Sequence, residues 1–179
     1  MDTIEVPKGE GALLIIVVII SAIAMEPITA VLHRAIMHHG GWSWHKSHHR
    51  RIGSQFERND LYPLCFSVIA IGLFILGTSS STFQGIGIGV TIYGATYLFV
   101  HEIVIHSRFG KVATSNRLFR YWRFAHNVHH QFNAAPFGFI APIVPKSLGD
   151  TSRQNPRNLI DRYGTSQNNR DSSIEVDAE

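Results

Sequence analysis

The chain has 179 residues, a formal net charge of +3 and 45% hydrophobic residues, and this length is typical of one domain. Its single cysteine, Cys65, excludes an intrachain disulfide and any metal or iron–sulfur site built from cysteines. The apolar residues are concentrated in three uncharged runs, at 12–25, 62–77 and 86–100, which are rare in a soluble chain of this size.

The first apolar run is expected to be a membrane span at 11–33. It follows three acidic residues and one lysine, whereas a secretory signal needs net positive charge there. Further spans are expected at 61–79 and 84–105, because each reaches roughly the 20 residues that a bilayer core requires. The stretch APFGFIAPIV at 135–144 is too short to span and contains two prolines, which favours an interfacial or re-entrant segment.

The basic residues orient these spans. Fifteen of the sixteen follow the first span, in segments 34–58, 108–123 and 146–170, which the positive-inside tendency places in the cytoplasm. The sequence thus predicts an all-α integral membrane bundle with a cytoplasmic, histidine-rich cap. We expect residues 1–145 to form the membrane domain and residues 146–179 to form a polar, flexible tail.

Ten of the eleven histidines fall into one pattern that occurs twice, an H-x4-H pair followed by an H-x2-H-H triplet. The first copy consists of His33, His38, His45, His48 and His49, and the second of His101, His106, His126, His129 and His130. His39 lies outside the spacing. Because the predicted topology puts both copies at one face of the membrane, we expect them to meet.

The two spacings suit metal binding by imidazole, a good ligand for iron, zinc, copper and nickel. On a helix, positions i, i+3 and i+4 lie on one side, so each triplet points three rings the same way. Positions i and i+5 diverge by roughly 140°, so each H-x4-H pair either serves two metals or needs a break in the helix. Ten imidazoles are enough for two ions. The repeat favours a dinuclear site over adventitious metal binding or haem.

The same residues resemble the histidine-box membrane hydroxylases of the fatty acid hydroxylase superfamily, and within it the bacterial β-carotene 3-hydroxylase group. The resemblance covers about residues 20–145. It rests on MEPITAVLHRAIMHHGGWSWHKSHH, FERNDLY, YGATYLFVHEIVIHSRFG, AHNVHH and FGFIAP. The chain differs from that group in Glu102, where Asp is usual, in the short insert QFNAAP and in the additional His39.

The resemblance implies that the ten repeated histidines bind two irons, which use O2 to hydroxylate the β-ionone ring of a carotenoid at carbon 3. The product of β-carotene would be zeaxanthin, formed via β-cryptoxanthin. The chain has no flavin, nicotinamide or iron–sulfur motif, so electrons must come from a separate protein such as ferredoxin. Basic residues could dock an acidic donor or contact anionic lipid, and no nucleic-acid partner is expected. These bases are Arg50, Arg51, Arg117, Arg120 and Arg123.

Two carboxylates are candidate functional residues. Glu102 precedes His106 by four residues and could accept the ring N–H that metal ligation leaves free. Glu26 lies inside a span, seven residues before His33, where a carboxylate is either functional or the partner of a buried polar group. Two other functions stay open at this point. The first is another lipid enzyme: a sterol or fatty acyl hydroxylase, a desaturase or a carotenoid ketolase. The second is a non-enzymatic metal- or haem-binding membrane protein.

Overall fold

The computed structural model describes residues 10–50, 56–110, 112 and 115–154, which form helices and connecting segments without a strand. Three helices are long: α1 (Glu10–Leu32), α3 (Leu61–Gly77) and α4 (Ser81–Tyr97). Three others are shorter: α2 (Trp42–His49), α5 (Arg117–Phe132) and α6 (Lys146–Gln154). Two π-helical segments, η1 (His33–Met37) and η3 (Leu98–Ile105), and one 3-10 turn, η2 (Arg58–Asp60), complete the order.

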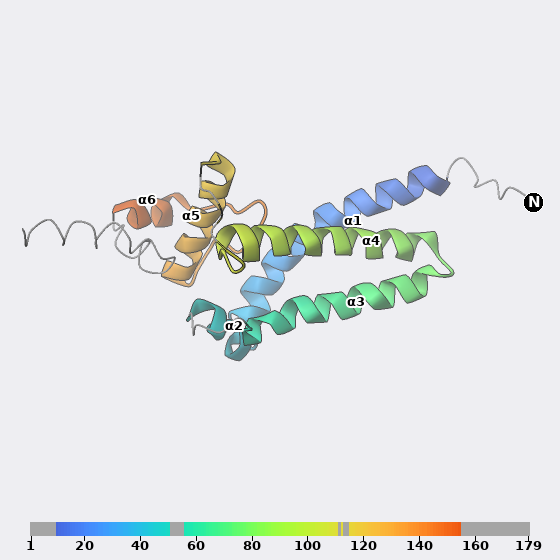
Figure 1. Cartoon of the computed structure of the whole chain (residues 1–179), viewed down its shortest axis with the longest axis horizontal. Coiled ribbons are helices and arrows are strands. Elements are labelled where there is room, and N and C mark those ends of the chain that lie inside the picture. Colours follow the sequence, from blue (N-terminus) through green and yellow to red (C-terminus); the bar gives the residue numbers. More distant parts are fainter. Residues whose placement is uncertain (1–9, 51–55, 111, 113–114, 155–179) are drawn as a thin grey trace, which may run out of the picture.

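The three expected spans are confirmed as helices that are long and apolar enough to cross a membrane, at Glu10–Met37, Arg58–Gly77 and Ser81–Ile105. Figure 1 shows the start of α1 and the α3–α4 turn at one end of the bundle. The short helices α2, α5 and α6 lie at the other end. The two histidine segments, far apart in sequence, therefore lie at the same end of the spans.

Glycines on α4 allow its close packing between α1 and α3. A Cβ atom on Gly89 would lie 2.6 Å from the Cβ of Ser21, and one on Gly85 would lie 2.8 Å from Val17 Cγ1. Such distances leave no room for a side chain on this face of α4. Small residues at the helix interface thus set the α1–α4 contact, as is common in membranes.

Each H-x4-H pair lies at a π-helical turn that continues a span. The His38 backbone N–H donates to the His33 carbonyl at 3.1 Å, and the His106 N–H donates to the His101 carbonyl at 3.0 Å. These bonds join residues five apart, so one wider turn places i and i+5 on the same side. The helix is therefore widened, rather than broken, between the two histidines of each pair.

The predicted interfacial or re-entrant stretch forms an irregular segment at 133–145, within which no residue is helical. It folds back against the spans, because the backbone N–H groups of 139–141 donate to Glu26 on α1. Helix α5 holds it from the other side: Trp122 Nε1 donates to the Ile140 carbonyl at 2.7 Å. This segment thus joins the cap to the membrane bundle.

Part of the predicted tail is an ordered helix in the structure. Helix α6 packs on α5, where the Ser152 hydroxyl is fully buried and donates to Gln131 Oε1 at 2.9 Å. Ordered structure therefore continues to Gln154, and residues 155–179 lie outside the described part of the chain. The division of the chain at 145/146 stays a prediction.

Candidate metal centre

Nine of the ten repeated histidines form two clusters, in each of which the ligand nitrogens all lie within 4.8 Å of one another. Cluster 1 contains His33, His38, His45, His49 and His129, and cluster 2 contains His48, His106, His126 and His130. The tenth, His101, lies beside cluster 2: its ring centroid is 4.6 Å from that of His106 and 4.7 Å from that of His126. His39 is exposed, and its Nδ1 lies 2.9 Å from the Arg34 carbonyl, outside both clusters.

Each H-x2-H-H triplet divides between the two clusters. The first and last histidines, four residues apart, stay together, and the middle histidine belongs to the other cluster. The crossing residues are His48, which joins cluster 2, and His129, which joins cluster 1. The sequence predicted three parallel rings in each triplet, but the structure shows that their nitrogens serve two positions. Each cluster therefore needs residues from both halves of the chain.

Outer contacts decide which ring nitrogen carries the proton in cluster 1. The Nδ1 of His33 lies 2.9 Å from the Phe137 carbonyl oxygen, and the Nδ1 of His129 lies 2.7 Å from the Ala134 carbonyl oxygen. A carbonyl oxygen only accepts, so each Nδ1 is the donor. The Nε2 of each ring then carries a free lone pair.

These Nε2 atoms face one another inside cluster 1. His33 Nε2 lies 3.0 Å from His45 Nε2, and His38 Nε2 lies 3.2 Å from the Nε2 atoms of both His33 and His129. Lone pairs directed at a common point repel one another, and a cation at that point removes the repulsion. The donor set of cluster 1 therefore fits a metal ion bound through Nε2.

The donor set of cluster 2 also fits a metal ion bound through Nε2. His106 Nε2 and His48 Nε2 lie 3.0 and 3.3 Å from His126 Nε2. His101 donates from Nδ1 to Glu102 Oε1 at 2.7 Å, and its buried Nε2 has no hydrogen-bond partner among the described residues. A buried nitrogen lone pair is normally satisfied. A metal ion in cluster 2 would satisfy it.

Four cluster histidines outside the spans have a lowered pKa, which favours their neutral form. Burial lowers the pKa of His38 to about 4, of His129 to about 3 and of His45 to about 2. Burial also lowers the pKa of His48, and the neighbouring His101 acts in the same direction. Neutral imidazole is the form that binds metals, so these histidines are in the protonation state that metal binding requires.

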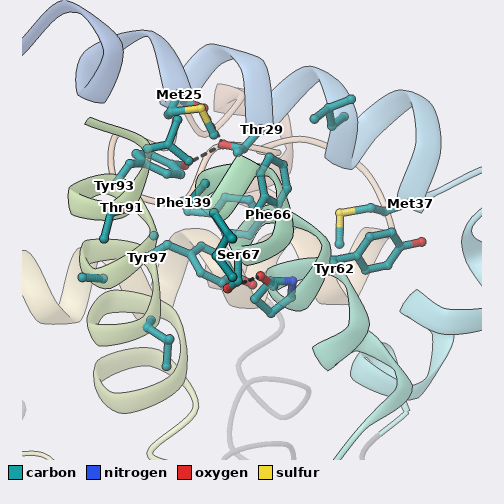
Figure 2. Close-up of a pocket in the computed structure, with 18 of the residues that line it drawn as sticks. Met25, Thr29, Met37, Tyr62, Phe66, Ser67, Thr91, Tyr93, Tyr97 and Phe139 are labelled. Carbon is teal, nitrogen blue, oxygen red and sulfur yellow. Dashed lines mark hydrogen bonds between the residues drawn. The ribbon is translucent and has the colours of Figure 1, made fainter. Parts of the chain in front are cut away.

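An apolar cavity of about 480 Å³ adjoins the clusters between α1, α3 and α4 (Figure 2). Several hydroxyl groups in its wall are hydrogen-bonded to the protein: those of Thr29 and Tyr93 lie 2.5 Å apart. The hydroxyls of Tyr62 and Ser67 each donate to a backbone carbonyl. The cavity therefore offers an apolar wall, which suits an apolar ligand of small-molecule size.

Phe139 lies between this cavity and the histidines. Its ring lines the cavity, is 5% exposed and stacks on the His33 ring with centroids 4.9 Å apart. The same ring meets Tyr97 edge-on at 4.8 Å and lies 5.3 Å from His101. A ligand in the cavity would therefore be close to His33 of cluster 1 and to His101 beside cluster 2.

Residues 18–149 match the family model described as fatty acid hydroxylase. The chain belongs to the fatty acid hydroxylase family. It is 41% identical to a β-carotene hydroxylase of Pseudescherichia vulneris over 140 residues, which cover 74% of this chain and 79% of that protein. It is 38% identical to the β-carotene hydroxylase of Pantoea ananas, over 73% of this chain and 79% of that protein. No solved structure matches the chain significantly.

Plant relatives are similar over their shared region. The chain is 39% identical to a chloroplastic β-carotene 3-hydroxylase of an Oncidium hybrid cultivar, over 66% of this chain and 41% of that protein. The resemblance drawn from the histidine boxes is therefore confirmed. Family membership and the two histidine clusters together fit iron binding by this hydroxylase-family chain.

The predicted contact of Glu102 is wrong in its partner. Glu102 Oε1 accepts from the Nδ1 of His101, and its Oε2 accepts from Arg108 Nη1 at 2.9 Å. The prediction assumed α-helical geometry, in which Glu102 and His106 would be neighbours. In the π-helical segment η3, residues five apart share a face instead. Glu102 thus contacts cluster 2 through the tenth histidine.

Glu26 contacts the irregular segment. Its Oε1 accepts from the backbone N–H groups of 139–141, at 2.9 to 3.0 Å. Its Oε2 accepts from the Tyr93 hydroxyl at 2.8 Å. The half-buried carboxylate is therefore the partner of the buried Tyr93 and of less buried backbone groups, in line with one of the two roles considered from the sequence. It fixes the backbone that carries Phe139 and the Phe137 carbonyl.

Several outer partners of the histidines were not predicted. Asn59 Oδ1 lies 2.7 Å from His45 Nδ1, and Glu57 Oε2 lies 3.5 Å from His48 Nδ1. Both residues belong to FERNDLY, which supported the resemblance but had been given no role. The carbonyl partners of His33 and His129 are backbone atoms, which no residue pattern reveals.

The basic residues proposed for donor docking have different environments. Arg123 donates from Nε to the Val104 carbonyl at 2.7 Å and from Nη2 to the Ser107 hydroxyl at 3.0 Å. Its guanidinium therefore connects α5 to the end of η3. Arg51 lies outside the described residues. The exposed members of the set are Arg50, Arg117 and Arg120.

Proposed function

We propose that this chain is a carotenoid hydroxylase that adds a hydroxyl group to carbon 3 of the β-ionone ring. It would convert β-carotene to zeaxanthin via β-cryptoxanthin. The observation that carries this proposal is the pair of histidine clusters beside an apolar cavity between membrane spans. The relatives named β-carotene hydroxylase supply the substrate class.

We infer that all ten repeated histidines bind two iron ions, five around each, with His101 completing cluster 2. Bound iron supplies the reductive activation of O2 that a ring C–H bond requires. The balanced reaction takes the ring C–H, O2, two electrons and two protons, and gives the ring C–OH and water. The electrons come from a separate reduced protein such as ferredoxin, because the sequence has no flavin, nicotinamide or iron–sulfur motif.

The protein's own residues bind the ring and orient the ligands. The cavity takes up the apolar end ring from the bilayer, and Phe139 limits how close it comes to His33. Glu26 and Glu102 act as positioning residues under this proposal. Glu26 holds the segment whose carbonyls orient His33, and Glu102 orients His101.

The sidedness follows from charge. The described parts of the basic segments lie at the histidine end of the spans, which the positive-inside tendency assigns to the cytoplasm. An acidic electron donor would reach the clusters from that side, where Arg50, Arg117 and Arg120 are exposed. Membrane lipid remains the competing partner for these bases.

The deciding experiment expresses the chain in cells that accumulate β-carotene and identifies the pigments. We expect β-cryptoxanthin and zeaxanthin, and unchanged β-carotene in cells with equal amounts of the His38→Ala variant. A keto carotenoid, or no new pigment with the protein present in membranes, would refute the proposal. With purified protein, activity should disappear when iron is removed and return with iron but not with zinc.

A further inference from the structure

One short segment, Glu57–Asp60, contacts ligands of both clusters. It forms the 3-10 turn that precedes α3, and a reciprocal capping box between Glu57 and Asp60 closes it. Asn59 at its centre is only 2% exposed. A buried amide needs hydrogen-bond partners, so its contacts define what this turn does.

Asn59 supports cluster 1. Its Oδ1 lies 2.7 Å from the Nδ1 of His45, whose Nε2 faces the cluster. If Nε2 binds a metal, Nδ1 carries the proton and donates to the amide oxygen. The Asn59 backbone N–H donates to the Ser47 hydroxyl at 3.3 Å, which ties the turn to α2. This bond keeps the Asn59 side chain next to His45.

Glu57 supports cluster 2. Its Oε2 lies 3.5 Å from the Nδ1 of His48, whose Nε2 faces His126. His45 and His48 belong to one triplet, and their rings lie 5.5 Å apart, yet they serve different clusters. The turn therefore offers one acceptor to each of these two histidines of α2: Asn59 contacts His45, and Glu57 contacts His48.

An ion-pair chain fixes this turn in place. Arg108 binds Asp60 with both terminal nitrogens, at 2.9 Å to Oδ1 and 2.7 Å to Oδ2. The same guanidinium donates to Glu102 Oε2, and Glu102 Oε1 accepts from His101. A bidentate pair of this kind restricts orientation more than a single contact does. The turn is thereby linked to His101 beside cluster 2.

We propose that the Glu57–Asp60 turn is a shared outer support for both metal positions. Asn59 is the positioning residue for His45 in cluster 1, and Glu57 is the positioning residue for His48 in cluster 2. This inference rests on the proposed function, since it requires two bound metals. It adds that one turn controls the two positions separately, through side chains two residues apart.

The test measures metal per chain after dialysis against a chelator of matched affinity. Loss of an outer partner typically lowers metal affinity about 10–100-fold. Asn59→Leu, which is similar in shape but has no acceptor, should therefore retain about one metal where the wild type retains two. Asn59→Asp keeps an acceptor at the same place and should retain two. Thermal unfolding of both variants shows that each is folded.

The same substitutions made in a His126→Ala protein identify which cluster loses its metal. His126→Ala removes a cluster 2 ligand and should leave one metal, in cluster 1. Adding Asn59→Leu to it should remove that metal, whereas adding Glu57→Leu should not. Should Asn59→Leu fail to accumulate, Asn59→Ser takes its place, because its hydroxyl is too short to reach His45.

The inference is overturned if Asn59→Leu retains as much metal as the wild type, or if Asn59→Asp loses as much as Asn59→Leu. Equal losses from Asn59→Leu and Glu57→Leu in the His126→Ala background would also overturn it. A wild-type chain that never holds two metals would refute the proposed function instead. The two failures are therefore distinguishable.

Discussion

The two clusters differ in the groups that hold their histidines from outside. Cluster 1 is supported by neutral acceptors, namely the Ala134 and Phe137 carbonyls and the Asn59 amide. Cluster 2 is supported by the carboxylates of Glu57 and Glu102. A carboxylate makes the imidazole it contacts a more basic ligand than a neutral acceptor does. Cluster 2 is therefore the position better compensated for positive charge.

The clusters also differ in the segments that support them. The segment that supports cluster 1 also contributes Phe139 to the cavity wall, so a bound ring and the cluster 1 ligands share one backbone segment. The support of cluster 2 is an ionic chain through Arg108.

Removing one inner histidine from either cluster should have the largest effect. His49→Ala in cluster 1 and His130→Ala in cluster 2 should each abolish carotenoid hydroxylation, because the reaction needs both positions. Each variant should still hold about one metal per chain. Elemental analysis of the purified proteins, beside pigment analysis of the cells, checks both expectations. If either variant keeps wild-type turnover, the comparison of two required clusters fails.

The Glu102 carboxylate should have an intermediate effect. Glu102→Ala removes the acceptor of the His101 N–H and should lower metal affinity about 10–100-fold. Glu102→Gln keeps an acceptor but loses the ion pair with Arg108, so it should fall between alanine and the wild type. Iron titration of the apoproteins measures this order. Equal affinities in all three proteins would show that the carboxylate does not tune cluster 2.

Two substitutions of Glu26 distinguish a role in supporting the structure from a need for its negative charge. Glu26→Ala leaves the three N–H groups of 139–141, which are partly buried or exposed, without their acceptor, and each lost hydrogen bond costs about 0.5–1.5 kcal/mol. Glu26→Gln keeps one oxygen for these donors, and its amide group can donate to the Tyr93 hydroxyl. We expect the alanine variant to unfold at lower temperature and the glutamine variant to stay folded and active. A folded but inactive Glu26→Gln would instead show that the negative charge is needed.

The spans and the meeting of the two histidine copies were predictable, because apolar length and repeated spacing are visible in the residues themselves. The path of the helix between paired histidines was not. Five-residue spacing is compatible with a break, with two separate metals or with a π turn, and only the backbone hydrogen bonds of His38 and His106 distinguish them. The partner of Glu102 was wrong for the same reason.

The outer contacts were predictable only in part. A carboxylate inside a span, such as Glu26, attracts notice because charge is costly there, although most of its partners are backbone groups that carry no sequence signal. Asn59 is an ordinary polar residue in a charged stretch, and nothing in its type shows that it lies beside His45. The division of each triplet between clusters depends on how α2 and α5 face each other, which is a tertiary property.

His39 should have the smallest effect of all, and it tests whether the pattern distinguishes ligands from neighbours. His39 and His38 are adjacent, but only the His38 ring faces cluster 1, with its Nε2 3.2 Å from two cluster nitrogens. The exposed His39 ring contacts the Arg34 carbonyl. We expect His39→Ala to keep wild-type metal content, turnover and melting temperature, and His38→Ala to lose the cluster 1 metal and turnover. The matched pair, measured in one preparation series, would contradict the assignment if His39→Ala were inactive while His38→Ala remained active.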